Sequence, residues 1–143
     1  MIDISHEIAN AFAATQIIVV FVIFLFTIFY PIIQKSIAAE KQVGDGEKAI
    51  NRLIKGKRST FLSKCSILIL GNFLVFLLFL PVIYSIYING TFNYETYSFI
   101  VIFAFTSCFL AWSIYMGYEL INNIKELGNF TCFSTIKYII LDK

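Results

Sequence analysis

Three long stretches without a charged residue constrain this chain more than any other feature. They run from Ile8 to Gln34, from Cys65 to Tyr94 and from Thr96 to Tyr118. Each exceeds the roughly 20 apolar residues that a helix needs to cross a hydrocarbon core about 30 Å thick. Charged residues make up only 14% of the chain, whereas soluble domains contain about 25%. We therefore predict an all-α integral membrane protein with three transmembrane helices.

The predicted spans cover about residues 9–33, 62–88 and 97–118 of one membrane domain, 1–143. A basic connection, 35–64, joins the first two spans, and a tail, 119–143, follows the third. All eleven Lys and Arg residues fall in the connection or the tail. Because Lys and Arg accumulate on the cytosolic side of membrane proteins, we expect the N-terminus outside and the C-terminus in the cytosol. The expected location is a bacterial inner membrane.

Two of the helices are expected to extend beyond the membrane into the cytosol. After Pro31, good helix formers continue to Gln42, and the Gly44-Asp45-Gly46 sequence that follows is expected to end the first helix. The third helix is expected to continue to Gly128, a residue type that commonly follows helix ends. The sequence leaves the fold of the remaining tail open.

The basic connection contains a short amphipathic pattern. Ile50, Leu53 and Ile54 recur at the spacing of one helix face. Gly56 is expected to end this short helix, and Ser59 is a candidate N-cap for the second span. Five basic residues surround the apolar stripe: Lys48, Arg52, Lys55, Lys57 and Arg58.

A basic amphipathic helix beside membrane spans most often lies on the membrane surface and contacts anionic headgroups. A cytosolic protein is the second expected partner for this segment. Nucleic acid is not expected, since the segment lacks interleaved aromatic residues and a nucleic-acid motif. A polar face on the extended third helix is expected to contribute to the same binding surface: Glu119, Asn122, Asn123 and Glu126.

Four residues of the spans are predicted to pack helices together. Ala13 and Gln16 lie in a small-residue and polar end of the first span, and Gly71 adjoins Asn72 inside the second. Small residues allow helix backbones to approach, and amides form hydrogen bonds across helices in a membrane. Asn72 needs a partner because an unpaired amide in hydrocarbon is unfavourable by several kcal/mol. A role in lining a pore or contacting a ligand is the alternative for Asn72.

The sequence offers few residues for catalysis. Cys65, Cys108 and Cys132 are widely spaced and are expected to be reduced thiols, and His6 is the only histidine. No nucleophile can be paired with a base, and no metal-ligand spacing occurs. We expect neither an enzyme nor a cofactor or metal site.

In topology, with three spans and the N-terminus outside, the chain resembles the class I holins of bacteriophages, although its long basic connection differs from their compact layout. The layout also resembles small membrane proteins encoded beside bacterial defence or immunity genes. Two functions are compatible with this pattern. The first is a non-catalytic protein that oligomerises, or serves as a membrane subunit that anchors a cytosolic partner through its basic loop. The second is an oligomeric pore, channel or holin-like protein, for which the uncharged spans provide little support.

Overall fold

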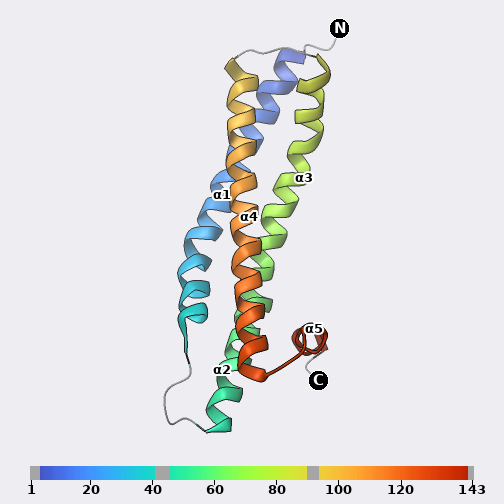
Figure 1. Cartoon of the computed structure of the whole chain (residues 1–143). Helices are drawn as coiled ribbons and strands as arrows, with labels where there is room; N and C mark the ends of the chain where they lie inside the picture. The colour runs from blue at the N-terminus through green and yellow to red at the C-terminus, as the bar shows by residue number, and fades with distance from the viewer. Residues whose placement is uncertain (1–3, 41–45, 90–93, 142–143) are drawn as a thin grey trace.

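The computed structural model describes residues 4–40, 46–89 and 94–141, and side chains within 13–40, 46–88 and 96–141. All regular structure in these ranges is helical (Figure 1). In chain order the elements are α1 (Ile4–Ala38), α2 (Glu47–Thr60), a π-helical turn η1 (Phe61–Cys65), α3 (Ser66–Asn89), α4 (Tyr94–Gly128) and α5 (Cys132–Leu141).

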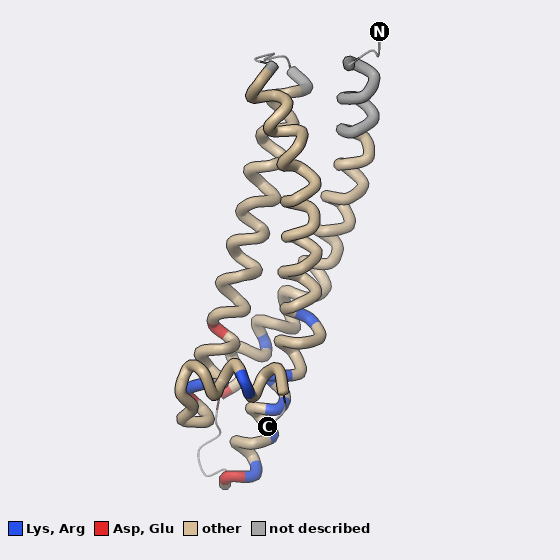
Figure 2. Tube along the Cα trace, turned by 90° about the vertical axis from the view of Figure 1, so that its right-hand side faces the viewer, with Lys and Arg blue, Asp and Glu red and all other residues tan. Residues whose placement is uncertain are grey.

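Three long helices run side by side as a bundle, with α5 lying across one end (Figures 1 and 2). The segments that are long and apolar enough to cross a membrane are Ala13–Ala38, Glu47–Ile88 and Thr96–Gly128. The prediction of three such helices is therefore confirmed, and they indicate a membrane protein. Each helix includes its predicted span and continues past it toward the end where α5 lies. The orientation and the identity of the membrane stay predictions.

The outer faces of the bundle are apolar, as expected of helices that contact lipid. Val20, Leu78 and Phe105 are 66%, 61% and 54% exposed. The interior holds two clusters of buried side chains along the spans, one with Val22, Val75, Phe79, Ile86 and Phe99, the other with Ile33, Cys65, Leu68, Met116 and Leu120. Residues from all three long helices contribute to each cluster or pack against it, so the bundle has a common core.

The basic segment does not form a separate helix ended by Gly56. The chain is helical without interruption from Glu47 to Asn89, so both Gly56 and Ser59 lie inside the helix. Ile54 and Lys57 on either side of Gly56 are buried, and this packing outweighs the weak helix propensity of one glycine. Ser59 is not an N-cap, because α2 continues through it into η1 and no helix begins there. The predictions for these two positions are wrong.

The end of α4 agrees with the prediction that the helix runs to Gly128. The chain reverses at the next residue, Asn129, whose φ is 49°. The Phe130 amide donates to Lys125 O at 3.1 Å, the bond of a Schellman turn. A Cβ on Gly128 would lie 2.3 Å from the Phe130 ring. Glycine therefore makes room for the ring at this turn, while asparagine adopts the left-handed conformation.

The tail after this turn forms helix α5. Thr131 serves as its N-cap, because its hydroxyl oxygen accepts a hydrogen bond from the Ser134 amide at 3.3 Å. Ile139 of α5 packs with Ile54 of α2 and Ile124 of α4 in a third apolar cluster. This cluster holds α5 against the end of the bundle.

Candidate functional site

A buried polar contact joins α3 to α4 within the spans. Asn72, only 1% exposed, donates from Nδ2 to Ser113 Oγ at 3.0 Å and to Leu68 O at 2.9 Å. Ser113 can accept this bond because its own hydroxyl donates to Phe109 O. The partner that the sequence required for Asn72 is thus a serine on the neighbouring helix. Asn72 Oδ1 is buried and has no donor among the described residues.

The other three predicted packing residues have no such role within the described chain. Ala13 and Gln16 lie on an exposed face of α1. A Cβ added to Gly71 would meet nothing within 4 Å, so this glycine does not bring two helices of the chain together. The close approach occurs at Gly117 of α4 instead. A Cβ there would lie 3.1 Å from Ile69 Cδ1 of α3.

Lys57 joins α2 to the last turn of α1. Its Nζ donates to Ser36 O at 2.6 Å and to Ile37 O at 3.1 Å. The carbonyls of a last helical turn lack partners within the helix and carry its negative dipole charge, so a cation stabilises them. Burial lowers the pKa of Lys57, which lies beyond the apolar part of its helix, and the charge of Glu40 opposes this shift. Lys57 is only 1% exposed and its ammonium contacts α1, while its predicted contact with a headgroup or a partner stays a prediction.

Arg58 is engaged on the opposite side, with α5. Its Nε donates to Ile139 O at 3.1 Å, and its guanidinium carbon lies 5.4 Å from the centre of the Tyr138 ring. The bonded carbonyl belongs to the last turn of α5. Lys57 and Arg58, adjacent in sequence, therefore each stabilise the C-terminal turn of a different helix, and they fix α2 between α1 and α5.

The remaining predicted basic residues of α2 make no such contacts with the described part of the chain. The side chains of Lys48, Arg52 and Lys55 are all exposed. The described Lys and Arg residues gather at one end of the bundle (Figure 2). We call the exposed face of α2 that carries Lys48, Arg52 and Lys55 the basic face. It projects beyond the spans on a helix that continues directly into α3.

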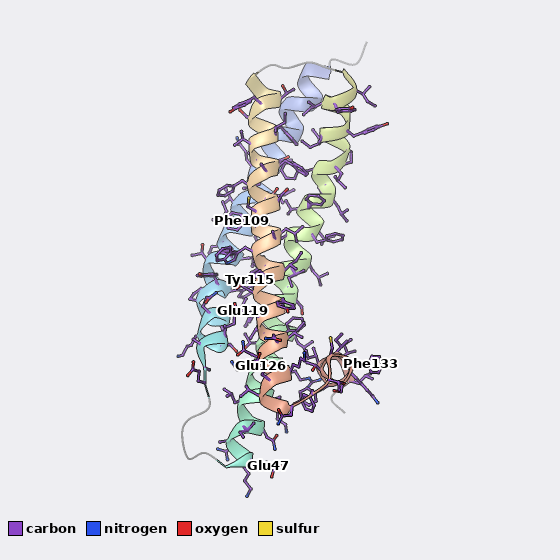
Figure 3. The ribbon with its side chains drawn as sticks, in the orientation of Figure 1. Glu47, Phe109, Tyr115, Glu119, Glu126 and Phe133 are labelled. Atoms are coloured by element: carbon purple, nitrogen blue, oxygen red, sulfur yellow. The ribbon has the colours of Figure 1, made fainter. Side chains whose placement is uncertain are left out.

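The polar residues predicted on the third helix lie along α4, where Figure 3 labels the first and last of them, Glu119 and Glu126. Asn122 Nδ2 donates to Glu126 Oε1 at 2.8 Å, and Asn123 Nδ2 donates to Glu119 O at the same distance. All these bonds join residues of α4 to each other. The two amides are thus already paired along the helix, while the Glu126 side chain is exposed.

An apolar groove of about 310 Å³ lies between α1 and α4 at the level of the spans. Its lining residues are Phe26, Tyr30, Phe105, Cys108, Phe109 and Trp112. No charged side chain is among them, so the groove has the same chemistry as the lipid-exposed surface. Comparison with protein-family models, with curated proteins and with solved structures gives no match.

Proposed function

We propose that the chain is a non-catalytic polytopic membrane protein that anchors a cytosolic protein, or oligomerises, through its charged end in a bacterial inner membrane. The observation that supports this most is the continuity of α2 with α3. A single helix, Glu47–Asn89 with its π-helical turn, carries the basic face directly out of the span. A basic loop without fixed structure would not hold charges at defined spacing, whereas this helix does.

The tertiary contacts of α2 support the same proposal. Lys57 bonds to α1 and Arg58 bonds to α5, so α2 is held on two sides while the basic face stays exposed. The residues for partner contact are then Lys48, Arg52 and Lys55, together with the exposed carboxylate of Glu126. Mixed charge of this kind favours a protein surface with complementary charges.

A pore is the weaker proposal, because the buried polar side chains lie inside the three-helix bundle. Among the described residues of the spans these are Asn72, Thr96, Thr106 and Ser113. The outward faces, which would have to line the lumen of an oligomer, carry mainly large apolar side chains such as Val20 and Leu78. Such a lumen would exclude water unless it were wide.

In-cell photo-crosslinking tests the proposal. A crosslinking residue at the exposed position Asn51, one turn from both Lys48 and Lys55, reports on partners of the basic face. The same residue at Leu70, which is 60% exposed in the second span, reports on neighbours within the membrane. We expect Asn51 to yield a discrete crosslink to a cytosolic protein, and we expect Lys48→Gln with Lys55→Gln to reduce its yield at least about tenfold.

The matched control removes two exposed lysines elsewhere, Lys125→Gln with Lys137→Gln, and should preserve the crosslink. Membrane leakage on overexpression is measured in parallel. One combination of results would refute the anchoring proposal in favour of a pore. In that case cells with the parent protein leak strongly, cells with the Lys48/Lys55 variant leak equally, and the residue at position 51 never crosslinks to another protein. Crosslinks between copies from Leu70, without leakage, would support the oligomer alone.

A further inference from the structure

A groove of about 350 Å³ lies at the charged end of the bundle, between the last turns of α1 and the middle of α2. Sequence patterns could not predict this groove, because it exists only where the two helices pack side by side. The lining residues include Ile32 and Lys35 of α1 with Arg52, Leu53, Gly56 and Lys57 of α2.

The groove combines exposed cations with an apolar wall. Lys35 and Arg52 are both exposed, so their N–H donors are available to a ligand. The buried Lys57 adds a third positive charge to the lining of the groove. Among the described residues, no carboxylate lines the groove, and the charge of Glu40, an exposed residue, acts on Lys57. Ile32 and Leu53 supply aliphatic surface beside the cations. An anion with an attached alkyl chain matches this combination, because arginine and lysine bind phosphate groups.

Gly56 lines the groove and leaves it open. Glycine destabilises the interior of a helix relative to alanine, and a tight helix contact would explain its presence. Gly56 has no such contact, since a Cβ at this position would meet nothing within 4 Å. The absent side chain leaves the groove open instead. A large side chain at this position would therefore narrow the groove.

The position of the groove along α1 fits the headgroup layer of a membrane. The charge-free stretch of this helix ends at Gln34, and Lys35 is the first charged residue after it. Ile32, one turn earlier, is 43% exposed. We infer that the groove binds one anionic phospholipid of the cytosolic leaflet, with its phosphate at Lys35 and Arg52 and the start of an acyl chain along Ile32. This inference rests on the membrane orientation proposed above.

Native mass spectrometry of the purified full-length chain in a neutral detergent tests the inference with dioctanoyl phosphatidylglycerol as the probe. We expect saturable binding of one lipid. Lys35→Gln with Arg52→Gln should weaken binding about tenfold or more, because it removes both phosphate-binding cations. Gly56→Leu should also prevent binding by filling the groove, while circular dichroism shows an unchanged or more stable helix.

Two control variants distinguish binding in the groove from diffuse electrostatic attraction and from a general effect of filling a glycine position. Lys48→Gln with Lys55→Gln removes the same total of two positive charges, both from α2, but no lining residue, and Gly71→Leu fills another glycine position with open space around it. Both should bind the lipid as the parent does. Equal weakening by the Lys48/Lys55 variant, or unchanged binding by Gly56→Leu, would overturn the inference in favour of diffuse attraction.

Two further probes identify the source of the phosphate. Dioctanoyl phosphatidylcholine, which has no net charge, should bind more weakly, and inorganic phosphate at millimolar concentration should not displace the anionic lipid. Equal binding of phosphatidylcholine, or displacement by inorganic phosphate, would refute an anionic lipid site. Because purified protein is used, failure to find a cytosolic partner in cells would leave this measurement unaffected.

Discussion

Replacing Lys57 by methionine tests the largest departure of this structure from what its charge pattern predicts. The substitution keeps a long unbranched side chain, shorter by one atom, and removes the donors to Ser36 O and Ile37 O. A hydrogen bond from a charged group contributes about 1.5–3 kcal/mol, so two such bonds contribute about 3–6 kcal/mol before the unfavourable burial of the ammonium is subtracted. That burial offsets several kcal/mol. We expect Lys57→Met to lower the free energy of unfolding by about 2 kcal/mol.

The assay is unfolding by increasing SDS in mixed micelles, followed by circular dichroism. Lys55→Met serves as the control, since Lys55 is exposed on the same helix and should change the free energy by less than about 0.5 kcal/mol. A Lys57→Met protein as stable as the control would refute the reasoning. It would mean that water satisfies the carbonyls at the end of α1 as well as the ammonium does.

Three other substitutions give separate tests. Gly117→Leu places atoms within 3.1 Å of Ile69 Cδ1, and by forcing α3 and α4 apart it should lower the free energy of unfolding by about 1–3 kcal/mol in the same SDS assay. Arg58→Gln should release α5 from α2 and make the segment after Gly128 at least several-fold more sensitive to protease, with the spans unchanged. The orientation can be tested with single cysteines in a chain without its native cysteines. A cysteine in place of Asn93 should react with an impermeant thiol reagent from outside the cell, whereas a cysteine in place of Lys48 should be protected. The reverse pattern would show that the orientation is opposite to the one proposed.

The spans were predictable because crossing a membrane depends on a property of consecutive residues. A stretch of sufficient length without charge is enough, and it does not matter which neighbours the helix meets. The end of α4 at Gly128 was predictable for a similar reason, since local chain chemistry determines where a helix stops. By contrast, the tail after Gly128 has no comparably strong local signal. Its helix depends partly on the contacts of Ile139 with α2 and α4.

The roles of residues that contact a neighbouring helix could not be predicted from consecutive residues of the sequence. Lys55 and Lys57 lie on either side of Gly56 in the same basic segment, yet one is exposed and the other is 1% exposed beneath α1. Gly71 and Gly117 are both glycines inside apolar helices, but only Gly117 faces another helix closely. In each pair the residue type is identical and the partner differs. Only the packing of the three long helices distinguishes them.

For Asn72 the sequence predicts the need for a partner, and the structure identifies that partner. The sequence predicted that this amide needs a partner, and the structure supplies Ser113 for Nδ2 while Oδ1 stays without a donor among the described residues. Asn72→Leu removes the bond but also the buried oxygen, so we expect a loss in unfolding free energy near the lower limit of about 0.6–2 kcal/mol for such bonds. A double-mutant cycle with Ser113→Ala should give a coupling of about 0.6 kcal/mol. If the coupling is zero and Asn72→Leu instead dissociates an oligomer of otherwise unchanged stability, then Oδ1 faces a second copy of the chain, and Asn72 acts between molecules rather than within one.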